Sequence, residues 1–328
     1  MSLPGVIPAA SWPRLSSLAL WFLMNRVCWI CLNNLRRRKE MERPMRHNEE
    51  EHPQGSCQQD QKKLNRIRCW LLDMDGTITL GEQLLPGAEL FFQALNQADY
   101  VFLTNNSSRR AMDYVQRMNR LGIPITRRQM LTSTDALILY LRQLSAGSEL
   151  RLFPVGTPEF EAELAEAGFQ LIHQRDQAID FVVIGFDTSL TYEKLDIACD
   201  YLRRETRWLA ANPDLVCPMP DDRVLPDCGS IIAFLTACTG RRPERVIGKP
   251  DTAMIDMILA DRGLDRDVVA MVGDRIYTDL AVAQRAGITG VAVLSGESDW
   301  SDIKNSGIIP EYVFPSIREL ADRLRQAD

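Results

Sequence analysis

The chain has 328 residues, 45% of them hydrophobic and 25% charged, which is typical of soluble proteins with one large domain or two ordinary ones. Its net charge of −6 argues against nucleic acid or an acidic membrane as the main partner. An anionic substrate stays possible, because a metal ion and one lysine can reverse the field inside a single cleft.

Eight cysteines without a disulfide-type spacing, and no secretory signal, predict a cytoplasmic protein. The first 65 residues are expected to be a disordered leader or an over-extended start, because the segment 40–63 is almost devoid of apolar residues. The apolar stretch 18–32 is interrupted by Asn25 and Arg26, so each piece is too short to span a bilayer, although an interfacial anchor is an alternative.

The leader also contains a spacing that zinc sites allow, formed by Cys28, Cys31, His47 and His52. A zinc finger needs a small apolar core between its ligand pairs, and here the interval is mostly Asn, Arg, Lys and Glu. We therefore favour coincidence over a metal site.

From Arg66 onward, short apolar runs alternate with amphipathic stretches, a rhythm that predicts βα units around a parallel sheet. In chain order the pattern predicts strand 69–72, helix 88–96, strand 100–103, helices 109–121 and 134–144, strand 150–155, helix 158–167, strand 181–184, helix 192–205, strand 208–211, helix 230–239, a strand end at 246–247, strand 268–272, helix 279–286, strands 291–294 and 312–314, and helix 317–325.

Polar residues follow four of these strands directly: Asp73, Thr104, Lys249 and Asp274. In an open parallel sheet, ligands bind beyond the carboxyl ends of the strands. We therefore expect two carboxylates, a hydroxyl and an ammonium group to converge on one crevice.

Asp73 and Asp75 are two positions apart, so both side chains are expected to face the crevice. Two such carboxylates repel each other unless a cation lies between them, and Mg²⁺ suits a site that also holds phosphate. The plain alternative is that Asp75-Gly76 is only a turn.

The remaining strand ends fit an anion site. Thr104 and Asn105 offer a hydroxyl and backbone N–H groups to a phosphate, and Lys249 can neutralise its oxygens. Asp274 is expected to ligate the metal ion. Asp279 either caps the following helix or orients Lys249.

Taken in order, Asp73-x-Asp75-Gly76-Thr77, Thr104, Lys249 and Gly273-Asp274-x4-Asp279 resemble the motifs of the haloacid dehalogenase (HAD) superfamily. The long insertion resembles subclass IIA, the NagD-like and para-nitrophenyl phosphatase-like proteins. This resemblance implies an α/β fold, with a Rossmann-like parallel-sheet core at 66–146 and 243–328 and an inserted α/β cap domain of the subclass IIA type at 147–242.

The resemblance also implies roles for individual residues. Asp73 would be the nucleophile that becomes an aspartyl phosphate, and Asp75 the general acid and base. Mg²⁺ would be bound by the Asp73 side chain, the Asp75 carbonyl and Asp274. In the cap, the residues expected to face the substrate are Asn212, Pro213, Asp214, Cys228 and Gly229.

The expected function is hydrolysis of small phosphate monoesters, such as sugar phosphates or nucleoside monophosphates. A phosphotransferase or mutase is one alternative, and a non-catalytic metabolite-binding regulatory protein is another. A homodimer through the cap is possible.

Overall fold

The computed structural model describes residues 62–95, 98–145, 147–219 and 223–326; residues 1–61, with Cys28, Cys31, His47 and His52, lie outside these ranges. A parallel sheet forms the core, with every neighbouring pair of strands parallel. In spatial order its strands are β15 (Tyr312–Phe314), β14 (Thr289–Val293), β13 (Val269–Gly273), β1 (Cys69–Leu72), β4 (Asp99–Thr104) and β5 (Met130–Thr132).

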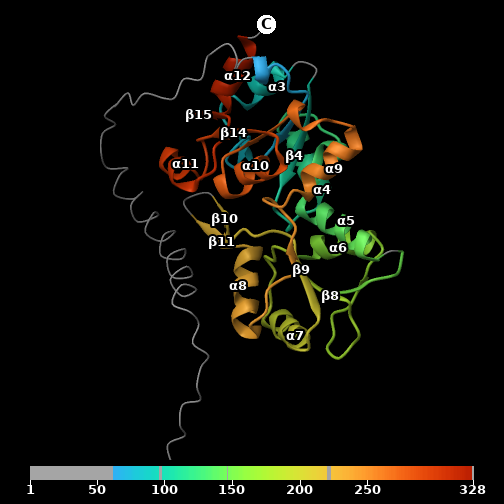
Figure 1. The fold of residues 1–328 in the computed structure, drawn as a ribbon. Helices are drawn as coiled ribbons and strands as arrows, with labels where there is room; N and C mark the ends of the chain where they lie inside the picture. The colour runs from blue at the N-terminus through green and yellow to red at the C-terminus, as the bar shows by residue number, and fades with distance from the viewer. Residues whose placement is uncertain (1–61, 96–97, 146, 220–222, 327–328) are drawn as a thin grey trace, which may run out of the picture. The chain divides into compact units, whose positions relative to one another are not determined.

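The side chains of β1 show how both faces of this sheet are covered. Cys69 and Leu71 point to one face and Trp70 and Leu72 to the other, because successive side chains of a strand alternate. A strand buried on both faces is a continuous apolar run, which is why this one was predictable. The first face is covered by α5 (Ser133–Ser145), α9 (Ala253–Arg262) and α10 (Ala281–Ala286), and the second by α3 (Ala88–Ala94), α4 (Ala111–Arg120) and α12 (Ile317–Arg325). Helices α3 and α12 lie side by side (Figure 1).

A second sheet, also parallel, is formed by the inserted segment. In spatial order its strands are β12 (Arg245–Val246), β9 (Arg207–Ala210), β8 (Phe181–Ile184), β6 (Arg151–Val155) and β7 (Gln170–Leu171). Its helices are α6 (Pro158–Glu166), α7 (Tyr192–Arg203) and α8 (Cys228–Thr239). Trp208 is fully buried between the sheet and α7 and α8, whereas α6 packs on the other face.

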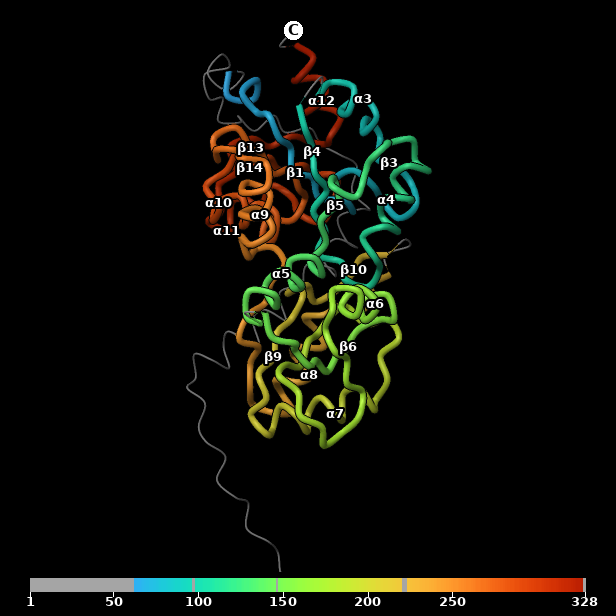
Figure 2. Tube along the Cα trace, turned by 90° about the vertical axis from the view of Figure 1, so that its right-hand side faces the viewer, coloured from blue at the N-terminus to red at the C-terminus, as the bar shows by residue number. Residues whose placement is uncertain are grey.

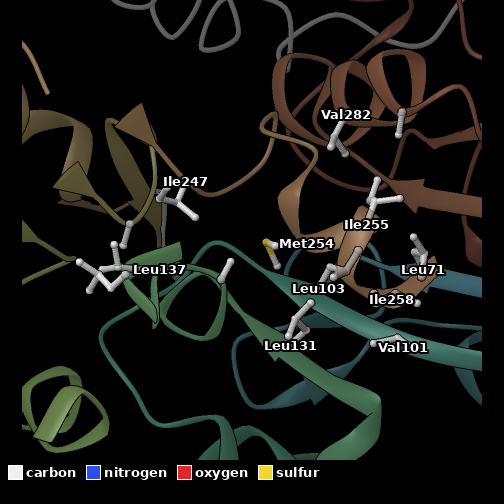
Figure 3. Packing of buried hydrophobic residues seen from close by; sticks show 14 of the residues in the cluster. Leu71, Val101, Leu103, Leu131, Leu137, Ile247, Met254, Ile255, Ile258 and Val282 are labelled. Atoms are coloured by element: carbon white, nitrogen blue, oxygen red, sulfur yellow. The ribbon is translucent and has the colours of Figure 1, made fainter. Parts of the chain in front are cut away.

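One apolar cluster continues from the first sheet to the second. It contains Leu71 and Val101 of the core sheet together with Leu152 and Leu209 of the cap sheet. Figure 3 shows part of this cluster around Met254. The shared cluster fixes the place of the cap relative to the core through burial of apolar surface.

Several short elements complete the described chain: the hairpin β2 (Thr79–Leu80) and β3 (Gln83–Leu84), the hairpin β10 (Val216–Pro218) and β11 (Val224–Pro226), helix α11 (Trp300–Ser306), and single helical turns at Arg127–Gln129, Arg266–Val268 and Ile276–Leu280. The sequence-based prediction missed these elements, and also β5 and β7. The missed strands have only two or three residues, and α11 only seven, which is too short to show a period of 2 or 3.6 clearly.

The predicted α/β class, with a parallel-sheet core and an inserted α/β layer, is confirmed, but details differ. β12 pairs with β9, so the second sheet continues to Val246, past the predicted boundary at residue 242. Leu64, inside the predicted leader, is buried in the core. The helix predicted from Asp279 begins earlier, with a π-helical turn at Ile276. Within the described residues, no helix has the length and apolar character needed to cross a membrane.

Candidate active site

The chain order of the core sheet reverses at β1, which lies between β4 and β13 (Figure 2). Such a switch point leaves a crevice at the carboxyl ends of the strands. Asp73 follows β1, Thr104 ends β4 and Asp274 follows β13. The topology therefore brings these three predicted residues to the same edge of the sheet.

The loop after β1 turns its two carboxylates toward the crevice. Met74 between them is buried, as the alternation of an extended chain requires. Asp73 and Asp75 both line the cleft. The backbone then turns at Gly76 with φ of 92°, and Thr77 Oγ1 donates a hydrogen bond to Asp274 Oδ1 over 3.2 Å.

Lys249 is the positive centre of the site. Its Nζ donates to Asp73 Oδ1 over 2.5 Å, to Asp279 Oδ1 over 2.6 Å and to the Leu103 carbonyl over 3.1 Å. Its side chain is 2% exposed. Burial alone would lower the Lys249 pKa, but the Asp279 and Asp73 carboxylates raise it above its ordinary value, so the amine is held as a cation.

The route by which Lys249 reaches the site differs from the prediction. The strand before it, β12, belongs to the cap sheet and not to the core sheet. Lys249 therefore arrives on the connection that returns from the second sheet to the first, close to the carboxyl end of β1. Lys249 does line the cleft, but the predicted reason, a fourth strand end of one sheet, was wrong.

Asp73, Asp274 and Asp279 form a buried acidic cluster whose carboxylate oxygens lie within 4.8 Å of one another. Burial, and then the charge of Asp73, raise the pKa of Asp274 to about 8 and that of Asp279 to about 7. Desolvated like charges at this separation favour a bound cation. Such an all-oxygen set fits a hard divalent ion.

The oxygens of Asp279 are already engaged. One accepts from Lys249, and the other accepts from the backbone N–H of Arg275 over 3.1 Å. Of the two predicted alternatives for Asp279, the contact with Lys249 is present, whereas Asp279 is not the N-cap of the following helix, because it lies within the turn Ile276–Leu280. Asp274 likewise accepts two hydrogen bonds, from Thr77 Oγ1 and from the backbone N–H of Glu297, so hydrogen bonding does not separate it from Asp279 as a metal ligand.

The loop after β4 is ordered by its own side chains. Thr104 Oγ1 accepts from the backbone N–H of Asn106 over 3.1 Å. The amide nitrogen of Asn105 donates to the Lys249 carbonyl over 3.0 Å and to Asp214 Oδ1 over 3.2 Å. The Asn105 side chain thus joins the core to the cap, so a phosphate contact from Asn105 would come from its backbone N–H.

The cap residues predicted to face a substrate occupy different places. Asp214 lines the cleft and forms an ion pair with Arg275, Nη1 to Oδ2, over 3.2 Å. Asn212 is buried and donates to the Asn105 carbonyl over 2.7 Å. Cys228 is 0% exposed, and its thiol donates to the Ile184 carbonyl. Gly229 lies against the Pro213 carbonyl: a Cβ added to Gly229 would lie 2.3 Å from that carbonyl oxygen, which is too close for any side chain.

Only Asp214 of this group therefore keeps the substrate-facing prediction. The prediction was wrong for Cys228, because its place at the start of α8 turns the thiol into the cap core. Asn212 Oδ1 accepts from the Asp214 N–H, and the Gly229 N–H donates to the Asp214 carbonyl, so these two residues hold the loop that carries Asp214; Pro213 does not line the cleft.

The cleft is also lined by Asn106 and Asp227, which belong to segments that the sequence indicated, the loop after Thr104 and the segment 227–229. Four further lining residues were missed: Cys217, Pro218, Arg275 and Thr278. Arg275 directly follows Asp274, and this position was the only signal available for it. Cys217 and Pro218 belong to the short β10–β11 hairpin, which the sequence pattern does not show.

The chain matches two models of haloacid dehalogenase-like hydrolases, over residues 70–170 and 246–320. It is 31% identical over 265 residues to an acid sugar phosphatase of Staphylococcus aureus, covering 80% of this chain and 100% of the relative. The chain belongs to the haloacid dehalogenase-like hydrolase family. This confirms the predicted superfamily and the predicted enzyme class, a phosphoric monoester hydrolase.

Solved structures of the family agree with this assignment. A 4-nitrophenylphosphatase from Thermotoga maritima superposes with a TM-score of 0.74 at 37% identity, covering 79% of this chain and 98% of that chain. A glycerol phosphate phosphatase from Mycobacterium tuberculosis, solved in complex with calcium, gives 0.71 at 29% identity, covering 79% and 76%. The family's parallel-sheet core and α/β cap are therefore both present here.

Proposed function

We propose that this HAD hydrolase is a Mg²⁺-dependent phosphatase that cleaves small phosphate monoesters through an aspartyl phosphate on Asp73. The observation that carries the proposal is the geometry around that carboxylate. It lies 2.5 Å from the Lys249 ammonium and within 4.8 Å of Asp274, at the switch point of the sheet.

In this proposal, Mg²⁺ is held by the Asp73 carboxylate, the Asp75 carbonyl and the Asp274 carboxylate. The bound ion would neutralise charge on the phosphoryl oxygens. The buried all-oxygen donor set supports this choice of metal. The calcium complex of the Mycobacterium relative also supports a hard divalent ion.

The residues of the chain divide the chemistry between them. An Asp73 oxygen attacks phosphorus while the bond from phosphorus to the alcohol oxygen breaks, and Asp75 gives its proton to that oxygen. Water then attacks the phosphorus of the aspartyl phosphate and gives a proton to Asp75, the bond from phosphorus to the Asp73 oxygen breaks, and inorganic phosphate leaves with the Asp73 carboxylate restored. Lys249 and Thr104 hold the phosphoryl oxygens through both steps.

The cap side of the cleft favours a small, hydroxyl-bearing leaving group. Burial, opposed in part by a backbone hydrogen bond from Cys228, raises the pKa of Asp227 to about 7. Near neutral pH this side chain can donate or accept a hydrogen bond. Burial raises the pKa of Cys217 to about 12, so it remains a thiol. Such a surface suits a sugar or polyol phosphate, the substrate classes named for the Staphylococcus and Mycobacterium relatives.

The test is phosphate release from p-nitrophenyl phosphate and a panel of sugar and polyol phosphates, with Mg²⁺ and with EDTA. The wild-type protein is compared with Asp73→Asn and with Asp322→Asn, which changes an exposed aspartate on α12. We expect Asp73→Asn to lower kcat by at least about 10³-fold and Asp322→Asn to leave it unchanged.

Radiolabelled substrate gives a second readout. Acid-quenched wild-type protein should retain labelled phosphate, and Asp73→Asn should not. Equal phosphate release by the wild type and Asp73→Asn would show that Asp73 is not the nucleophile.

A further inference from the structure

Arg117 is a buried arginine next to the active site that the proposed chemistry has not yet used. It lies on α4, the helix that follows the Thr104 loop, and its side chain is 6% exposed. Burying a guanidinium costs free energy unless its charge is paired and hydrogen-bonded. Its partners therefore indicate what it is there to hold.

The partners of Arg117 lie on both sides of the loop that carries Asp75. Arg117 Nη2 lies 3.3 Å from Asp75 Oδ1 and also donates to the Gly81 carbonyl, at the turn of the β2–β3 hairpin. Its Nε lies 3.8 Å from Glu82 Oε1 in the same turn. One side chain thus ties Asp75 to the hairpin that follows it.

Both polar contacts of the Asp75 carboxylate go to the same oxygen. Thr79 Oγ1 donates to Oδ1 over 3.1 Å, and Arg117 Nη2 donates to the same oxygen over 3.3 Å. The described residues make no hydrogen bond to Oδ2. Anchoring Oδ1 therefore leaves Oδ2 as the oxygen available to a reacting group.

This anchoring matters because the Asp75 side chain is 42% exposed, and among the described residues only Thr79 and Arg117 donate side-chain hydrogen bonds to its carboxylate. We propose that Arg117 is a positioning residue, which holds the Asp75 carboxylate and the β2–β3 turn so that Oδ2 meets the leaving-group oxygen. The inference rests on the proposed function, in which Asp75 protonates that oxygen. Displacing a reacting group by about 1 Å can cost on the order of 10²-fold in rate.

The test uses two substrates that differ in their need for a general acid. Nitrophenolate leaves without a proton, whereas the alkoxide of glycerol 3-phosphate needs one. The ratio kcat/KM is compared because it reports only the steps up to departure of the alcohol. Arg117→Met should lower kcat/KM about 10²-fold for glycerol 3-phosphate and less than about fivefold for p-nitrophenyl phosphate.

Two further variants separate positioning from general packing. Arg117→Lys keeps the charge. Its kcat/KM for glycerol 3-phosphate should be at least about tenfold higher than that of Arg117→Met. Arg120→Met removes an exposed arginine of the same helix and should leave both substrates unchanged. Inhibition by inorganic phosphate should be the same in all variants, because the phosphate pocket is intact.

Equal losses with both substrates, or no loss with glycerol 3-phosphate, would overturn the positioning role. If Arg117→Met does not fold, the same comparison is made with Arg117→Lys, which should then show a smaller loss confined to glycerol 3-phosphate. Absence of phosphate release by the wild type would instead refute the proposed function itself.

Discussion

Gly296 and Gly76 lie directly against the Asp274 carboxylate. A Cβ built on Gly296 would lie 1.9 Å from Asp274 Oδ2, and one on Gly76 would lie 2.5 Å from the same atom. The backbone N–H of Glu297 donates to this oxygen over 2.7 Å. The close approach of backbone without side chains thus lets Asp274 be buried and still hydrogen-bonded.

We predict that Gly296→Ala displaces Asp274 and weakens the proposed metal site. The Mg²⁺ concentration for half-maximal activity should rise about tenfold or more, because second partners of a metal ligand typically contribute 10- to 100-fold to affinity. The measurement is a Mg²⁺ titration of phosphate release. Gly290→Ala is the control, since its Cβ would meet nothing closer than 3.3 Å. Unchanged Mg²⁺ dependence in Gly296→Ala would contradict the prediction.

At the scale of elements, the contact between α4 of the core and α6 of the cap is electrostatic. The N-terminal N–H of Ala111 on α4 donates to Glu163 Oε1 over 2.9 Å, and Arg110 forms an ion pair with Glu166. Burial nevertheless raises the pKa of Glu163 from its ordinary 4.5 to about 7. Desolvation therefore outweighs the favourable hydrogen bond at the helix end.

A carboxyl group whose pKa is raised in the folded state holds its proton more tightly there than in the unfolded chain. The contribution of Glu163 to the free energy of unfolding is therefore fully present below pH 4.5. It is lost as the pH rises from 4.5 through about 7. Glu163→Gln does not titrate, so it should be more stable than the wild type at pH 8 by about 1–2 kcal/mol and nearly equal at pH 5.

Thermal or urea unfolding at the two pH values measures this difference. Glu159→Gln, an exposed position in the first turn of the same helix, is the matched control and should show no pH-dependent gain. A Glu163→Gln variant less stable than the wild type at pH 8 would show that the charged carboxylate stabilises the contact.

At the scale of the whole molecule, every proposed site residue lies in the unit formed by residues 56–328. The two family models match residues 70–170 and 246–320, and 80% of the chain is enough to cover the whole Staphylococcus relative. We therefore predict that a chain starting at Met45 keeps kcat/KM within about twofold of the full chain. Assay of the two proteins with the preferred substrate at saturating Mg²⁺ tests this. A larger loss would show that the first 44 residues contribute to activity.

The sequence by itself determined which strand-end residues would lie at the cleft. The positions of Asp73, Thr104 and Asp274 were predictable because each comes at the end of a short apolar run that indicates a buried strand. Where such a run ends can be seen in the neighbouring residues alone. The same local reasoning identified β1, β8, β15 and α12 with the bounds that the structure has.

Only the tertiary structure decided how these residues meet. Lys249 bonds to Asp73 across 176 positions, by a route that depends on β12 joining the cap sheet. Asp214 faces the cleft whereas Cys228 is buried, and Arg117 is bound to Asp75. These outcomes follow from packing between segments far apart in the chain, which strand and helix periodicity does not encode.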